Sequence, residues 1–350
     1  MDLGYLNSRI RAWRGSLLDK EDYDSLIGAR DIHGMVNYLK DGAYARDMEI
    51  SAARNTNETD VIEGAIKGNL TRTFKNLWEY APDEAGVLLK VIFSVWEVYN
   101  LKAVLRAKSK GVSPAESMTV LMPSGDMDES ALKELNQQKD IFELANLLST
   151  WGSPYAKPVK EGIRQYTRER HLAGIELGLD RFIHDYCLSV AMAAGGINGE
   201  IIKRFVRERI DSINISTLIK LSGDGILPAN ISDYFLEGGE VLDKDRFLML
   251  AISKDTRVLL EGLANAVKDS RWKDAIISLE SENIFFLEEQ IEELTRQNLC
   301  RLAIIEPLSI ALAICFIYTK IREIKNLRVI VRAKIFNMPV IEMKRFLILG

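Results

Sequence analysis

The chain is poor in proline, cysteine and histidine, and it has no excess of basic charge. It contains 8 prolines, 3 cysteines and 3 histidines in 350 residues, and its formal net charge is −4. The cysteines lack the paired spacing of a zinc site, and His33, His171 and His184 are far apart and have no neighbouring nucleophile or ligand set. We therefore expect no metal centre and no catalytic histidine, and the acidic balance gives no case for nucleic acid as a partner.

The chain also lacks the loop that binds nucleotide phosphates. No Gly-x-x-x-x-Gly-Lys-Ser/Thr pattern occurs anywhere in it. The acidic clusters at 126–129 and 288–293 are expected to be solvated loop and helix faces rather than metal sites. We expect no catalytic residues, no cofactor and no direct nucleotide binding.

One apolar run, residues 302–318, raises the question of a membrane span. Glu306 and Pro307 interrupt it and leave about eleven apolar or small residues, short of the roughly 20 that a spanning helix needs. A charge near the middle of a bilayer would cost a further ~2–3 kcal/mol. We expect a buried core helix with Pro307 near its first turn.

What the sequence does contain is one short pattern in three copies. The pattern is an acidic residue, two further residues, an asparagine and a branched apolar residue. It occurs at Glu97–Leu101, Asp211–Ile215 and Glu323–Leu327. The asparagines of the three copies are Asn100, Asn214 and Asn326, which lie 114 and 112 residues apart. This spacing predicts a triplicated chain, with a period far above that of ordinary solenoid repeats.

Other features keep the same phase relative to each asparagine. A glutamate in an apolar setting precedes it by 37 or 38 residues, a glycine follows it by 24 or 25, and a basic residue follows it by six. The glutamates are Glu63, Glu176 and Glu288; the glycines are Gly125, Gly238 and Gly350; the basic residues are Arg106, Lys220 and Arg332. These positions predict three modules, at residues 1–125, 126–239 and 240–350.

The apolar residues recur with helical spacing, and no convincing strand alternation appears. The stretches Leu101–Lys108 and Leu327–Lys334 each carry an apolar stripe and a charged flank. We therefore expect an all-α fold. Asparagine inside a helix lowers helix propensity and, if buried, needs partners for its amide. The repeated asparagines and acids either hold helices in place or contact a partner directly.

The charge distribution suggests a docking surface. Residues 320–345 hold eight Lys or Arg against only Glu323 and Glu342, so the last module carries a basic sector in an acidic protein. One interpretation is a solvated helix face with ordinary salt bridges. The other is that the three repeated basic residues, Arg106, Lys220 and Arg332, present positive charge to an acidic part of a partner.

Several segments resemble the C subunits of archaeal-type (A-type) ATP synthases, a family that includes the d subunit of the vacuolar proton pump. They are Tyr5–Arg11, Tyr99–Lys108, Glu176–Arg181 and Glu323–Lys334, and the resemblance extends over essentially the whole chain. No single motif among them is a catalytic signature, so the resemblance rests on their order and spacing.

The resemblance implies a funnel of three helical modules around a pseudo-threefold axis. It also implies a peripheral, non-catalytic rotor subunit on the cytoplasmic face of a membrane proteolipid ring. Such a subunit receives the central stalk and transmits torque between the ATP-driven head and the ion-carrying ring. We expect a monomer in isolation, since the pseudo-symmetry is internal to the chain.

Two other classes remain. A helical repeat scaffold that binds soluble protein partners would share the triplication and the lack of catalytic motifs. An all-helical enzyme would need convergent carboxylates, and no Asp-Asp-x-x-Asp pattern is present.

Overall fold

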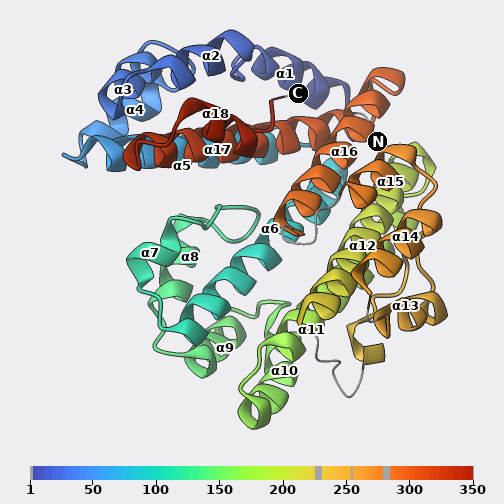
Figure 1. Ribbon diagram of the computed structural model, residues 1–350. Helices are drawn as coiled ribbons and strands as arrows, with labels where there is room; N and C mark the ends of the chain where they lie inside the picture. Colours follow the sequence, from blue (N-terminus) through green and yellow to red (C-terminus); the bar gives the residue numbers. More distant parts are fainter. Residues whose placement is uncertain (1–2, 225–230, 254, 279–283, 350) are drawn as a thin grey trace. The chain divides into compact units, whose positions relative to one another are not determined.

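The computed structural model describes residues 3–224, 231–253, 255–278 and 284–349, and its regular elements in these ranges are all helices (Figure 1). The expectation of an all-α fold is confirmed. The chain divides into two compact units. Unit 1 comprises Met1–Trp151 and Glu306–Gly350, and unit 2 comprises Gly152–Ile305.

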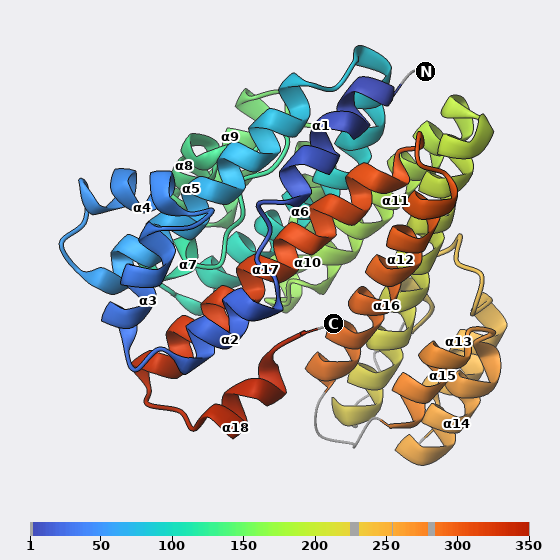
Figure 2. The same cartoon turned by 90° about the horizontal axis from the view of Figure 1, so that it is seen from above.

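Unit 1 is built from both ends of the chain. Its helices are α1 (Gly4–Arg14), α2 (Lys20–Gly28), α3 (Ile32–Lys40), α4 (Ala45–Ala52), α5 (Glu58–Glu79), α6 (Asp83–Lys110), α7 (Pro114–Met118), α8 (Glu129–Gln137), α9 (Ile141–Thr150), α17 (Ala311–Ile335), α18 (Val340–Met343) and the 3-10 helix η2 (Lys344–Phe346). Helix α17 packs against α1 and α5 (Figure 2). The N-terminal and C-terminal segments thus share one core.

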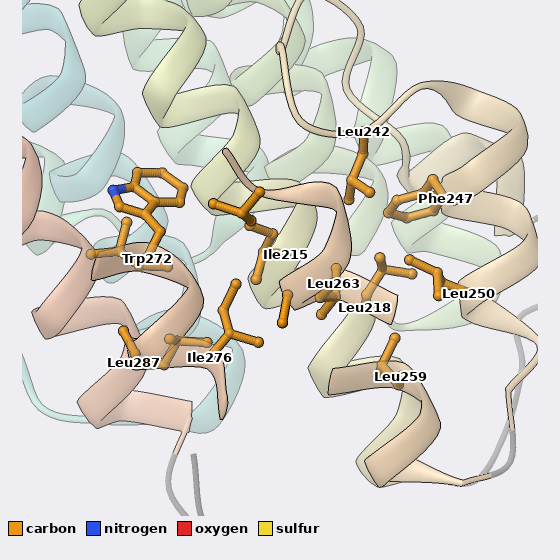
Figure 3. Packing of buried hydrophobic residues seen from close by; sticks show 14 of the residues in the cluster. Ile215, Leu218, Leu242, Phe247, Leu250, Leu259, Leu263, Trp272, Ile276 and Leu287 are labelled. Carbon is orange, nitrogen blue, oxygen red and sulfur yellow. The ribbon is translucent and has the colours of Figure 1, made fainter. Parts of the chain in front are cut away.

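Unit 2 is a continuous stretch of chain. Its helices are α10 (Ala156–Glu169), α11 (Ala173–Ala194), α12 (Gly196–Asp224), the 3-10 helix η1 (Ile231–Tyr234), α13 (Lys244–Ala251), α14 (Thr256–Ala266), α15 (Ser270–Ile277) and α16 (Ile284–Ile305). An apolar core joins the end of α12 to α13, α14, α15 and α16 (Figure 3). Its aromatic centre is the pair Phe235 and Phe247, whose ring centroids lie 5.3 Å apart.

The same order of helices occurs three times along the chain, as α2–α6, α8–α12 and α13–α17. Each set has three short helices, then a helix of 22 residues, then a long helix of 28, 29 or 25 residues. The repeat in the sequence therefore has a counterpart in local structure. The module boundaries at 125 and 239, and a threefold arrangement in space, stay predictions.

Aspartates define where each set begins. The first two helices of every set have an aspartate N-cap whose side chain accepts backbone N–H groups of the first turn. The six caps are Asp19, Asp31, Asp128, Asp140, Asp243 and Asp255. Each cap stabilises its helix by about 1 kcal/mol, because it satisfies N–H groups that the helix itself leaves unpaired.

The apolar run 302–318 is divided between two helices. Helix α16 ends at Ile305, and α17 begins at Ala311. The prediction that Pro307 lies near the first turn of a helix is wrong: it lies in the turn between them, where its carbonyl accepts hydrogen bonds from Asn7 and Arg11. The proline ring disfavours helical backbone in the residue before it, so the chain turns there.

The part of this run that follows the turn is core. Every residue from Ala311 to Tyr318 is buried in α17. In the described part of the chain, no helix combines the length and the apolar character needed to cross a membrane.

Candidate functional site

Each of the three repeated asparagines is buried on a long helix and binds both backbone groups of one residue 22 positions later. Asn100 on α6 donates from Nδ2 to the Met122 carbonyl (2.6 Å) and accepts the Met122 N–H at Oδ1 (2.9 Å). Asn214 on α12 does the same with Leu236, at 2.8 and 2.9 Å. Asn326 on α17 does so with Ile348, at 3.0 Å for both bonds. We call this arrangement the asparagine clamp.

The clamp explains why asparagine occupies these helical positions. A carboxamide has one donor side and one acceptor side, so it can pair with the N–H and the C=O of a single residue. The three side chains are at most 1% exposed, and a buried backbone group without a partner costs about 1–3 kcal/mol. These hydrogen bonds fit the first of the two explanations that the sequence leaves open, in which the asparagines hold chain segments in place.

The acid three residues before the asparagine binds the segment that contains the clamped residue, a few residues further along the chain. Glu97 accepts the Asp126 N–H at 2.7 Å, and Asp211 accepts the N–H groups of Glu240 and Val241, each at 2.9 Å. Burial raises the pKa of Asp211, and these backbone hydrogen bonds oppose the rise. The acid therefore closes a second contact between the long helix and the segment that follows it.

Two of the residues that donate these N–H groups, Asp126 and Glu240, also form side-chain ion pairs. Asp126 forms an ion pair with Lys90 (2.6 Å), and Glu240 forms one with Arg207 (2.5 Å). In both cases the basic residue lies on the same long helix as the buried acid. The loop is thus held to its helix by backbone and by side chain.

A glycine lies against each of these two carboxylates. A Cβ on Gly125 would lie 2.0 Å from Glu97 Oε1, and a Cβ on Gly239 would lie 2.2 Å from Asp211 Oδ1. Gly125 also has a positive φ of 53°, which favours glycine. The sequence repeat paired Gly125 with Gly238, but by its contacts Gly239 is the counterpart. Gly350 is outside the described residues.

The third acid takes its partner from the other end of the chain. Glu323 on α17 accepts the Leu18 N–H at 2.6 Å, and Leu18 precedes the cap of α2. It also accepts the Tyr44 hydroxyl (2.6 Å) and pairs with Lys320. Burial is the main reason that the pKa of Tyr44 is raised, and the nearby Glu323 carboxylate adds to it. The N-terminal segment therefore contacts α17 through the acid that elsewhere holds the segment next in the chain.

A lysine eight residues after the asparagine was missed in the sequence. Lys108 donates to the carbonyls of Asn136 (3.1 Å) and Gln138 at the end of α8. Lys334 donates likewise to the carbonyls of Ile27 (2.7 Å) and Ala29 at the end of α2. Burial lowers the pKa of both lysines. The constant phase of eight residues could have revealed them, although α12 carries serine at this position.

The remaining predicted residues lie on the helix surfaces. Arg106, Lys220 and Arg332 are all exposed, as expected for a docking role, and Lys220 forms an ion pair with Glu288 at 2.7 Å. Arg106 and Arg332 belong to unit 1, and Lys220 belongs to unit 2. Glu63 lies 3.4 Å from Arg328 of α17, and Glu176 is half-buried on α11. The docking role of the three basic residues stays a prediction.

These contacts are structural in character. The buried acids bind backbone N–H groups, and the half-buried Lys108 and Lys334 bind helix-end carbonyls. In the ranges that the structure describes, no cluster of three or more His, Cys, Asp or Glu has the arrangement of a metal site. The arrangement can hold long helices and their loops as rigid bodies.

Comparison with known proteins agrees with the resemblance seen in the sequence. Residues 6–346 match the family described as ATP synthase (C/AC39) subunit. The A-type ATP synthase C subunit of Methanocaldococcus jannaschii is 26% identical over 351 residues, which cover 98% of this chain and 86% of the relative. The subunits of the same name from Methanococcoides burtonii and Archaeoglobus fulgidus are 26% and 24% identical and cover 95% and 99% of this chain, with 90% and 96% of the relatives covered. The chain belongs to the ATP synthase (C/AC39) subunit family.

Proposed function

We propose that the chain is a non-catalytic rotor subunit of an A-type ATP synthase. It couples the central stalk to the membrane proteolipid ring and transmits torque for ATP synthesis or for ATP-driven ion transport. It is bound peripherally, on the cytoplasmic face of the ring, as three helical modules that form a funnel around the stalk.

One observation carries this proposal: the asparagine clamp recurs on three long helices in a member of the ATP synthase (C/AC39) subunit family. A subunit that transmits torque has to resist deformation under load. Each clamp fixes its segment by two hydrogen bonds, which are buried at Asn100 and Asn214 and partly buried at Asn326. Two of the acids add bonds to a following loop residue. Rigid attachment of loops to long helices is what such a coupler needs.

The three exposed basic residues are the proposed contacts to the complex. Arg106, Lys220 and Arg332 occur at one phase of the repeat, so a threefold set of positive charges would face acidic groups of the stalk or ring. Charged contacts at the rim of an interface act mainly on association rate and on salt dependence.

The proposal is tested with an ATP synthase complex purified without this chain. The depleted complex is reconstituted into vesicles, and ATP hydrolysis and ATP-driven ion uptake are measured before and after the chain is added. We expect hydrolysis without uptake in the depleted complex, and uptake restored by the chain. Full ion uptake without the chain, or recovery of the chain only with unrelated soluble proteins, would contradict the coupler function and favour a scaffold.

Charge reversal tests the contact residues separately. A triple variant with Arg106→Glu, Lys220→Glu and Arg332→Glu should rebind the depleted complex more weakly and with less dependence on salt. The matched control reverses three other exposed basic residues, by Lys20→Glu, Lys75→Glu and Arg257→Glu. Equal binding of the two variants at all ionic strengths would exclude the three residues as the docking set.

A further inference from the structure

The end of α17 and the turn after it expose large apolar side chains. We define the C-terminal tip as residues Ile335–Phe346, which include α18 and η2. Phe336 and Ile341 are 76% and 73% exposed. Ile335, Val340 and Phe346 are exposed as well, whereas Met343 points inward and is buried. From the tip the chain runs back along α17 to Ile348, the residue held by the third asparagine clamp (Figure 2).

The same backbone occurs earlier in unit 1, at residues 109–120. Each tip is preceded by a lysine that donates to carbonyls at the end of another helix. Each tip also contains one residue with positive φ, Gly111 at 67° and Asn337 at 50°. In each tip, the N–H of the residue with positive φ donates to the carbonyl three residues before it, and the next N–H donates to the carbonyl five residues before it. Each tip is then followed at the same distance by a clamped residue. The segment 109–120 is therefore the counterpart of the C-terminal tip, position by position.

The exposed side chains of the two tips differ in kind. Ser109, Lys110 and Ala115 in the first tip correspond to Ile335, Phe336 and Ile341 in the C-terminal tip. Two further exchanges add positive charge, with Met118 and Thr119 corresponding to Lys344 and Arg345. Ser117, the counterpart of Met343 in the first tip, is also buried. Since Ser109, Lys110 and Ala115 are compatible with this backbone, its folding does not require large apolar side chains at these three positions.

Large exposed apolar side chains that folding does not need point to an interface. The charges beside it indicate the chemistry of what covers it. Lys344, Arg345 and Arg332 are exposed around the apolar residues, and Glu342 is the acid among them. A surface that binds anionic lipid typically gathers about four to eight basic residues. The smaller basic set and the acid favour a protein.

We infer that the C-terminal tip docks a protein segment with apolar side chains next to carboxylates, carried by another subunit of the same complex. The inference rests on the proposed function for the identity of the complex. Apolar residues in the centre with charges at the rim are the usual composition of such an interface.

The test exchanges the exposed residues of the C-terminal tip for those of its counterpart. The full chain with Ile335→Ser, Phe336→Lys and Ile341→Ala is added to the ATP synthase complex purified without this chain, and rebinding is measured against the wild type. Hydrogen exchange of the Ile348 amide verifies that the third clamp is intact. The control carries Met249→Ser and Ile252→Ser, which remove two side chains that are 60% and 61% exposed in unit 2.

We expect at least a tenfold loss of affinity for the tip variant and none for the control. Equal rebinding of tip variant and wild type would overturn this inference alone. If the wild type itself does not rebind, the proposed function fails and this inference fails with it.

A photo-crosslinking residue at Phe336 of the assembled complex identifies the occupant. A crosslink to an acidic segment of another subunit is the expected result. A crosslink to lipid, together with tip-dependent binding to vesicles of phosphatidylcholine and phosphatidylglycerol, would replace the protein partner by a membrane surface and overturn the inference.

Discussion

Removal of one asparagine clamp should destabilise unit 2 by an amount that the geometry defines. Asn214→Ala deletes two hydrogen bonds, at 2.8 and 2.9 Å, and leaves the N–H and the C=O of Leu236 unpaired. Leu236 is 2% exposed and Asn214 is fully buried, so water does not readily replace the amide.

The expected loss follows from these two groups. Each unpaired buried group costs about 1–3 kcal/mol, and alanine recovers a few tenths to about 0.7 kcal/mol of helix propensity over asparagine. The net change is a decrease of about 1.5–5.5 kcal/mol in the free energy of unfolding. For a body of this size it corresponds to a fall in Tm of roughly 3–22 °C.

Urea unfolding and hydrogen exchange measure the two consequences. The free energy of unfolding is compared between the wild type, Asn214→Ala and the control Asn265→Ala, which changes an exposed asparagine on α14. The control should stay within about 0.5 kcal/mol of the wild type. The Leu236 amide should lose protection only in Asn214→Ala. A destabilisation below about 1 kcal/mol, or an unchanged Leu236 amide, would refute the clamp as a structural device.

Three further changes test the contacts around the clamps. Gly125→Ala should destabilise the protein by about 2 kcal/mol or more, because the new Cβ would meet Glu97 and the φ of this residue is positive. The control Gly86→Ala, which lies in open space on α6, should be neutral or stabilise the protein by up to about 1 kcal/mol. Thermal unfolding measures both variants, and equal effects would count against the close approach of Gly125 to Glu97. Lys334→Met leaves two carbonyls at the end of α2 without the lysine and should lower the free energy of unfolding by about 1–2 kcal/mol. Hydrogen exchange should become faster in α2 only. Unchanged exchange in α2 would show that the lysine does not hold this helix end. The raised pKa of Asp211 means that the folded protein binds more protons than the unfolded chain, so this group's contribution is full below about pH 4 and is lost as pH rises through the folded pKa. Asp211→Asn should remove that slope from urea unfolding measured between about pH 3.5 and 6, and an identical pH profile for the variant would refute the assignment.

The all-α fold predicted from the sequence was confirmed, and the basis of that prediction is local. The apolar periodicity predicted helices, and the described part of the chain is helical. The phase of the asparagines located three positions that form the same two hydrogen bonds. Glu306 and Pro307 argued against a membrane span, and the chain turns there. Pro307 itself was assigned to the wrong place. Proline is tolerated both in a turn and in the first turn of a helix, so the sequence did not distinguish the two positions.

Other contacts could not be predicted because their partners are distant in the chain. The third acid follows the sequence pattern of the other two, yet Glu323 binds Leu18, 305 residues away, instead of a following loop. Lys334 binds carbonyls of α2 in the same way that Lys108 binds those of α8. Nothing in the pattern around α17 identifies the N-terminal segment as its partner.

The sequence by itself determined the helical class, the triple repeat and the positions of the buried polar residues, because periodicity and side-chain chemistry are properties of short segments. The tertiary structure alone decided which backbone groups those residues bind, and which apolar side chains at 335–346 stay exposed. Hydrogen-bond partners and exposure depend on segments that meet only after folding, and unit 1 assembles its core from both ends of the chain.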